Sequence, residues 1–335
     1  MGDRDMPPTE AVELSLPGDS SFRPSMVFAI VIVGMLGASR PGAAAPNDVG
    51  RPPLTPPTEH APLTDDPAWT PQREAAERGD AAAQFALGGQ YATGDGVPQD
   101  VVQAVRWWRR AAEQGHVPAE LNLAVAYQSG VGVPKDDATA VAWYRRAADQ
   151  GDPTAQLHLG EAYEDGDGVP PNPAEAVRWW QKAADQGDVL AQNHLGQAYH
   201  EGDGAPQDFA LALHWYRLAA ERGQAQAQSN LGFMYQNGQG VARDSGQAVQ
   251  WWRRAALGGN TSALFNLAVA YFNGDGVMPD DVEAYKWVEL AEAHAPDERQ
   301  LKYAALREAL LMKMTTAQVA EGHQRVQEWT GLFEK

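Results

Sequence analysis

Apolar residues recur at helical spacing along most of this chain, and one pattern returns every 36 residues. In the stretch that begins at Ala104, positions 104, 108, 111 and 112 hold alanine or tryptophan, which places them on one face of a helix. Glycines close the units at the same interval, at Gly79, Gly115, Gly151, Gly187, Gly223 and Gly259. A strict period of this length predicts a solenoid of stacked supersecondary units.

Each unit divides into two helices joined by a tight turn. The first helix spans about Ala81 to Tyr91 in the first unit and ends in a Y-x-x-G-x-G turn, whose glycine can adopt the left-handed conformation that a helix C-terminus needs. The second helix follows a short polar side chain, which can accept hydrogen bonds from the free N–H groups of the first turn. These N-cap residues are Asp100, Asp136, Asn172, Asp208, Asp244 and Asp280.

Paired aromatic residues occupy one position of the second helix, and nine of the eleven tryptophans of the chain lie there. Adjacent residues of a helix point about 100° apart, so one ring can pack inside its own repeat and the other against a neighbouring repeat. We therefore interpret the "RWWRR" stretch at Arg106 as packing, with arginines along the outer face and their charged heads in water. The net charge of −18 also argues against binding to nucleic acids or anionic membranes.

The N-terminal part of the chain has a different composition. Residues 26–38 form an apolar run of 13, the usual length of a signal-peptide core, and Ala43 to Ala45 fit a cleavage site. Residues 1–25 are acidic for such a signal, which leaves open a start at Met26, an uncleaved anchor or a cytosolic protein. The absence of cysteine excludes disulfides, Cys-ligated metal sites and a lipoprotein anchor. We expect an exported, periplasmic or envelope-associated protein.

These patterns predict five consecutive segments, each with its own composition. They are a signal or targeting segment (1–45), a proline-rich disordered linker (46–66), an N-terminal capping helix (67–78), the repeats (79–295) and C-terminal capping helices (296–335). Thr315 or Thr316 is the predicted N-cap of the last helix.

The repeated motif A-x-x-x-L-G-x-x-Y-x-x-G-x-G-V … A-x-x-W-[WY]-x-x-A-A-x-x-G resembles the Sel-like repeat (SLR) family, which is related to the tetratricopeptide repeat. In one unit it reads Ala155, Leu159, Gly160, Tyr163, Gly166, Gly168, Val169, Ala176, Trp179, Trp180, Ala183, Ala184 and Gly187. The resemblance implies an all-α, right-handed α/α superhelical solenoid of six repeats with a concave groove. It also implies an adaptor or scaffold for other proteins, in bacteria often exported. Some cysteine-rich members act on β-lactams, but this chain lacks their cysteines.

A polar position precedes the central leucine of the first helix in most repeats. In the related tetratricopeptide fold, an asparagine there points into the groove and holds a peptide backbone or carboxylate. The predicted partner-binding residues at this position are Asn122, His158, His194, Asn230 and Asn266. Residues that we expect on the same face are Glu161, Gln197, Gln128, Glu164, His200, Gln236 and Phe233. The alternatives are that these side chains are solvated or link neighbouring repeats.

Two features resemble chemical sites. His158 and Glu161 have the i, i+3 spacing of metal ligands, but His194 on the next repeat is expected about 10 Å away, too far for joint ligation. The acidic G-x-G turns lack the ligand series of a calcium loop. We predict no catalytic residue, metal or cofactor. The chain is interpreted as a bacterial protein-interaction adaptor, with a hydrolase or binder of cell-wall fragments or β-lactams and a purely structural spacer as alternatives.

Overall fold

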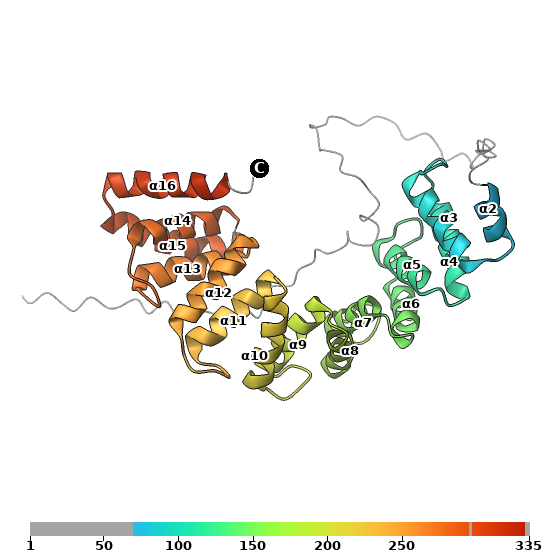
Figure 1. The fold of residues 1–335 in the computed structure, drawn as a ribbon, viewed down its shortest axis with the longest axis horizontal. Helices are drawn as coiled ribbons and strands as arrows, with labels where there is room; N and C mark the ends of the chain where they lie inside the picture. Colours follow the sequence, from blue (N-terminus) through green and yellow to red (C-terminus); the bar gives the residue numbers. More distant parts are fainter. Residues whose placement is uncertain (1–69, 295–296, 332–335) are drawn as a thin grey trace, which may run out of the picture. The chain divides into compact units, whose positions relative to one another are not determined.

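The computed structural model describes residues 70–294 and 297–331, in which the regular elements are fifteen α-helices (Figure 1). The predicted signal segment and linker lie outside these residues. The described residues form two compact units, which meet between Gln207 and Asp208. No described helix combines the length and the apolar composition needed to cross a lipid bilayer.

The helices of the first unit are α2 (Thr70–Glu77), α3 (Ala81–Thr93), α4 (Val101–Glu113), α5 (Val117–Ser129), α6 (Asp137–Asp149), α7 (Pro153–Asp165), α8 (Pro173–Asp185) and α9 (Val189–Glu201). Those of the second are α10 (Phe209–Glu221), α11 (Ala225–Asn237), α12 (Ser245–Leu257), α13 (Thr261–Asn273), α14 (Asp281–Ala293), α15 (Asp297–Lys313) and α16 (Thr316–Thr330). From α3 to α14, odd-numbered helices are the first of each repeat, helix A, and even-numbered ones the second, helix B. The predicted all-α solenoid is confirmed.

Local capping explains where the helices begin and end. All six predicted N-cap residues of the B helices accept backbone hydrogen bonds; Asp100, for example, accepts from the N–H groups of Val102 and Gln103. Every helix A of the six repeats ends at a glycine with a left-handed backbone, such as Gly94 with φ 79°. Thr315, one of the two predicted candidates, caps α16 in a reciprocal capping box with Gln318.

The second glycine of each turn has a different role, because it touches the preceding repeat. A Cβ on Gly132 would lie 2.5 Å from the carbonyl oxygen of Val101, at the start of α4. Gly168 and Gly276 approach the starts of α6 and α12 in the same way. The G-x-G turn therefore packs one repeat onto the repeat before it, and a side chain at its second glycine would force the two repeats apart.

The second aromatic residue of each pair packs within its own repeat. A Cβ on Gly88 of α3 would lie 2.5 Å from the indole of Trp108, and Gly160 and Gly232 approach Trp180 and Trp252 similarly. Where helix A carries alanine instead, helix B carries a smaller residue, as in the buried pairs Ala124 with Tyr144 and Ala268 with Val288. A larger side chain on helix A is thus compensated by a smaller one on helix B, and the two helices stay closely packed.

The other ring of the pair was predicted to pack against a neighbouring repeat, and at Trp143 and Trp179 that neighbour is the preceding repeat. Trp179 packs in a cluster formed mainly by the repeat before it, and Trp143 does the same one repeat earlier. The following basic side chain lies over the ring: the Arg110 guanidinium is 4.5 Å from the Trp107 ring centroid, and Lys182 Nζ is 3.5 Å from that of Trp179.

The sequence suggested that the arginine guanidinium groups would only be solvated. In the structure they also make hydrogen bonds. The arginine that directly follows the aromatic pair donates hydrogen bonds from its guanidinium group to a tyrosine hydroxyl of the next repeat. These pairs are Arg109 with Tyr127, Arg145 with Tyr163, Arg217 with Tyr235 and Arg253 with Tyr271. The motif seen in "RWWRR" therefore links repeats: at Trp143 and Trp179 the first ring packs against the preceding repeat, and arginines such as Arg109 bond to a tyrosine of the next repeat.

A buried glutamine of helix A connects three helices. Gln156 Nε2 donates to the carbonyl oxygen of Ala148 in the preceding helix B, and its Oε1 accepts from Gln186 at the end of its own repeat. The glutamines at positions 84, 192 and 228 donate in the same way. These bonds satisfy polar groups that would otherwise be costly to bury.

Glu120 occupies this glutamine position in the second repeat, and its side chain has no exposed surface. Its carboxylate lies 3.1 Å from an Arg146 nitrogen and accepts from Gln150 at 2.8 Å. Arg146 also donates to the carbonyl oxygen of Ala112, the bond that a glutamine would supply. Burial raises the pKa of Glu120, and Arg146 and Gln150 offset only part of that effect.

The C-terminal helices close the second unit. Both α15 and α16 pack against α14, and Trp329 meets Trp287 edge-on with ring centroids 4.8 Å apart (Figure 1). Arg325 of α16 contacts Glu283 at 2.7 Å and Asp280 at 3.6 Å. Apolar packing and ion pairs thus cover the face of α14 that a further repeat would otherwise bury.

Gly88 and Gly89 offer a test of the close helix packing, because only Gly88 faces an indole, whereas a Cβ on Gly89 meets open space. G89A should raise the free energy of unfolding by about 0.5–1 kcal/mol through helix propensity. G88A should lower it by about 1–2 kcal/mol, because overpacking outweighs the same gain. W108Y should lower the free energy of unfolding less in the G88A background than alone, because alanine and tyrosine at these two positions would then match Ala124 and Tyr144 of the second repeat. Urea unfolding of the parent, the three single variants and the G88A/W108Y double variant measures this, and equal effects of G88A and G89A would contradict it.

The Glu120 site predicts a second pattern. R146A should lower the free energy of unfolding by about 2 kcal/mol or more, because a buried carboxylate loses its cation. E120Q alone should be neutral or stabilising, since glutamine serves at positions 84, 156, 192 and 228. In the E120Q background, R146A should cost much less. A double-mutant cycle by urea unfolding checks this, and additive effects would refute the coupling.

Candidate functional site

The predicted partner-binding residues of the first unit lie on its A helices, but they differ in exposure. Asn122 of α5 is buried, whereas His158 of α7 and His194 of α9 keep 22% and 17% of their side-chain surfaces exposed. Gln128 and Gln197 are half-buried, and Glu164 is more exposed. The accessible part of this set is therefore centred on α7 and α9.

Glu161 brings the two histidines into one cluster. Its Oε2 lies 2.8 Å from His158 Nδ1, and its Oε1 lies 3.6 Å from His194 Nε2. The sequence spacing predicted the first contact, because i and i+3 share a helix face. It placed His194 about 10 Å from the equivalent His158, yet the Glu161 carboxylate between them contacts both. Linking neighbouring repeats was one of the alternative roles for these side chains, and Glu161 and His194 adopt it.

Aromatic rings of the B helices hold both histidines. The His194 ring stacks on Trp180 with a centroid distance of 4.6 Å and an angle of 15° between planes. His158 lies 5.1 Å from the ring of Tyr144, whose hydroxyl donates to Gln128 Oε1 at 2.8 Å. The aromatic residues that build the core thus also position polar residues of helix A.

The charges of the cluster favour an ion pair. Burial alone would raise the pKa of Glu161, but hydrogen bonds and attraction from His158 and His194 outweigh it and lower the pKa to about 2. Burial works against protonation of His194, yet Glu161, Glu164 and Asp188 together raise its pKa. Burial raises the pKa of Tyr144, and the Glu161 charge adds to that effect.

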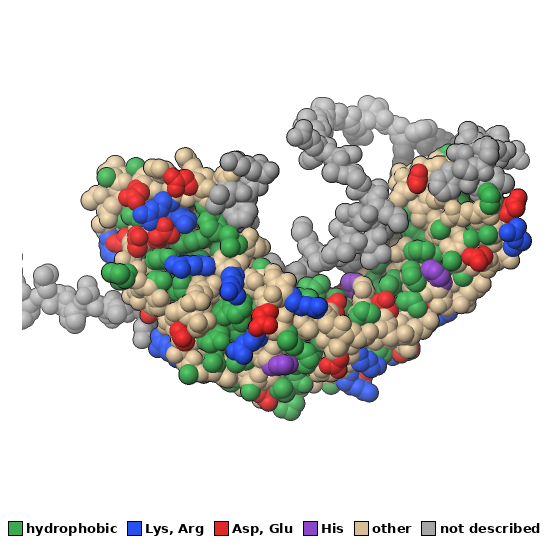
Figure 2. Space-filling view, in the orientation of Figure 1, with side chains coloured by type: hydrophobic (Ala, Val, Ile, Leu, Met, Phe, Trp, Pro, Cys, Tyr) green, Lys and Arg blue, Asp and Glu red, His purple; other side chains and the backbone are tan. Residues whose placement is uncertain are grey.

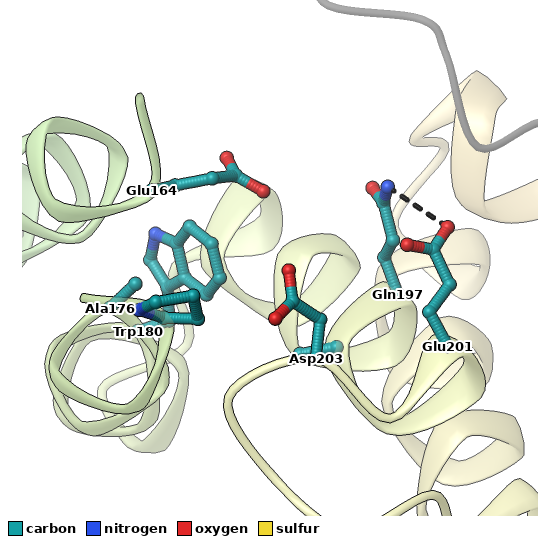
Figure 3. Close-up of a pocket in the computed structure, with 8 residues that line it drawn as sticks. Glu164, Ala176, Trp180, Gln197, Glu201 and Asp203 are labelled. Carbon is teal, nitrogen blue, oxygen red and sulfur yellow. Dashed lines mark hydrogen bonds between the residues drawn. The ribbon is translucent and has the colours of Figure 1, made fainter. Parts of the chain in front are cut away.

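A small open cavity lies beside this cluster (Figure 3). The face of Trp180 forms one wall, and Glu164, Gln197, Glu201 and Asp203 surround it. Gln197 Nε2 donates to Glu201 Oε1 at 3.2 Å. Burial raises the pKa values of Glu164 and Glu201, and the neighbouring carboxylates, Asp203 among them, add to that effect. The cavity is acidic and aromatic, and its volume of about 20 Å³ holds roughly one water molecule.

Sequence reasoning missed three residues of this cavity. Trp180 was interpreted as core, and Glu201 and Asp203 were considered only as part of an acidic G-x-G turn and a rejected calcium loop. Asp203 follows the left-handed Gly202, and the turn directs its carboxylate toward the indole (Figure 3). No sequence signal marks this meeting, because it depends on how α8 and α9 pack.

The predicted residues of the second unit do not form such a cluster. Asn230 Oδ1 accepts from Gln226 Nε2 at 3.0 Å, and Gln226 accepts in turn from Asn260 of the next repeat. Gln236 is buried, while Phe233 and Asn266 are half-buried. His200, in the last helical turn of α9 in the first unit, is half-buried as well. Phe265 belongs to the core and stacks on Tyr303.

Other kinds of site find less support in the described residues. Within 70–294 and 297–331, no group of three or more histidines and carboxylates has a geometry that could hold a metal ion. The G-x-G turns serve in packing between repeats, as described above. On the face drawn in Figure 2, Lys and Arg side chains are interspersed with Asp and Glu rather than gathered into one basic surface.

Comparison with known proteins gives consistent matches. Six consecutive segments match the Sel1 repeat: residues 81–116, 117–152, 153–188, 189–224, 225–260 and 261–294. The chain is 37% identical to a protective antigen of uropathogenic Escherichia coli strains displaying an SLR fold, with a TM-score of 0.67. That match covers 78% of this chain but 56% of the antigen, so the chain spans little more than half of the antigen's length.

A second solved structure, a Sel1 repeat protein from Oxalobacter formigenes, is 32% identical with a TM-score of 0.60. This match covers 67% of the chain and 90% of that protein. A search of curated proteins found no match.

Proposed function

Because the chain belongs to the Sel1 repeat family, a family of interaction scaffolds, we propose that it is a non-catalytic adaptor that binds an extended segment of a partner protein along its A helices. The resemblance read from the sequence motif is confirmed by these matches. The observation that carries the finer proposal is the accessible cluster of polar residues on α7 and α9, beside a cavity that opens between neighbouring repeats.

The chemistry of the cavity favours one kind of side chain. Glu164, Glu201 and Asp203 supply negative charge around the face of Trp180. An extended segment that places a lysine or arginine there would gain both charge attraction and a cation–π contact. Gln197 and His158 nearby offer hydrogen bonds to a peptide backbone.

The small size of the cavity disfavours the alternative of a hydrolase or a binder of cell-wall fragments at this place. Small-molecule sites usually enclose about 300–1000 Å³, far more than this cavity provides. A protein segment needs no deep enclosure, because it can spread its contacts over several A helices.

Binding assays with three variants test the proposal. A partner is first captured by crosslinking from native extract, and its bound segment is mapped and synthesised. The ladder variant carries H158A, H194A and Q197A, at accessible polar positions of α7 and α9. The cavity variant carries E164Q, E201Q and D203N. The control variant, R106A with E113A, alters exposed residues of helix B. Circular dichroism verifies the helices of each chain.

The ladder variant should weaken binding of the segment about 10-fold or more, because several hydrogen bonds of about 0.5–1.5 kcal/mol are lost. The cavity variant should weaken it about 10-fold and reduce its salt dependence. Replacing the basic residue of the segment should have no further effect in that variant. Equal binding by all four chains would reject the adaptor site, and loss in the control variant alone would move the site to helix B.

We also propose that the mature protein is exported, on the basis of the apolar run at 26–38 and the Ala43–Ala45 motif. The envelope fraction of the native host should contain a chain whose N-terminus lies at about Pro46, as read by N-terminal sequencing. A cytosolic chain that retains residues 26–45 would contradict export.

A further inference from the structure

Glu161 contacts a histidine in each of two neighbouring repeats. Its carboxylate lies 2.8 Å from His158 Nδ1 on its own helix, α7, and 3.6 Å from His194 Nε2 on α9. The contact with His194 therefore joins the A helices of the third and fourth repeats. These residues all belong to the first unit.

Both ring nitrogens of His194 face carboxylates. Nε2 lies 3.6 Å from Glu161 Oε1, and Nδ1 lies 4.0 Å from Glu164 Oε2, both on α7. The neighbouring helix α8 offers only the uncharged face of Trp180, and Asp188 at the N-cap of α9 adds a further negative charge. A neutral imidazole carries one N–H group, whereas an imidazolium donates from both nitrogens. The surroundings of His194 are thus built for the protonated ring.

We propose that His194 and Glu161 form a proton-dependent joint between the third and fourth repeats, which is tightest when His194 is protonated. Most other repeats place an asparagine at this position: Asn122, Asn230 and Asn266. Their amides do not change charge with pH, so this response belongs to one point of the solenoid. The inference does not depend on the adaptor proposal, although Glu164 also lines the cavity.

The direction of the pH dependence follows from the charges. The pKa of His194 is raised above its ordinary value of 6.5, so its stabilising contribution is complete below that pH and is lost as the pH rises through the raised value. The raised pKa of Glu164 acts in the same direction at lower pH. Glu161, with its pKa lowered to about 2, stays ionised throughout. The joint should therefore loosen as the pH rises through the raised pKa of His194.

Histidine NMR titration tests the joint directly on the full chain. The carbon-bound ring protons of His194 and of the exposed His214 are followed from about pH 5 to about pH 9. We expect the His194 midpoint to lie above that of His214, and to fall in E161Q, where burial and the charges of Glu164 and Asp188 remain but that of Glu161 is gone. A His194 midpoint at or below that of His214 in the unaltered chain would overturn the proposal, as would an unchanged midpoint in E161Q.

Thermal unfolding supplies a readout of the joint itself. Between about pH 6 and about pH 8.5, the Tm of the parent chain should fall by about 2–4 °C more than the Tm of H194N. H194N introduces the asparagine found at this position in most other repeats. His323 lies 3.0 Å from Glu289 in the second unit, so all chains also carry H323N to remove that histidine–carboxylate contact. H214N serves as the control and should keep the profile of its parent. Parallel profiles for H194N and its parent would show that protonation of His194 does not hold the repeats together.

Discussion

The close approach of helix A and helix B is the constraint on which the rest of this structure depends. A two-helix repeat cannot bury both of its apolar faces alone, so its stability comes from packing against itself and its neighbours. Gly88, Gly160 and Gly232 admit an indole against the backbone of helix A. The second glycine of the G-x-G turn, as at Gly132, lets its repeat approach the preceding one as closely. With these two contacts at van der Waals distance, alanines suffice for much of the remaining core.

Close packing also decides how polar groups are buried. The preceding helix B lies so close that the buried glutamine of helix A donates a hydrogen bond directly to its backbone. Glu120 keeps the same geometry with a charge, and Arg146 supplies both the missing donor and the counter-ion. The second repeat therefore accommodates a charge at this position because its hydrogen bonds and counter-ion are supplied.

The same geometry brings candidate functional groups together on α7 and α9. The aromatic residue that fills the core of a repeat also presents its ring to a histidine of helix A, as Trp180 does to His194. Glu164 faces both that histidine and the small acidic cavity. Structural cohesion and a surface for a partner thus share residues, which gives substitutions here two kinds of effect and explains why stability and binding must be measured separately.

The sequence by itself determined the period, the helix boundaries, the caps and the role of the paired tryptophans. These features depend on local interactions, such as Asp100 with the first turn of α4, and their repetition at 36 residues makes them visible. It also placed His158 beside Glu161, because three residues on one helix fix that distance. The contact of Glu161 with His194, the burial of Asn122 and Gln236, and the meeting of Trp180, Glu201 and Asp203 were decided only by the tertiary structure. Each depends on the spacing and rotation of neighbouring helices to within about an ångström, and that spacing results from the packing of many side chains together.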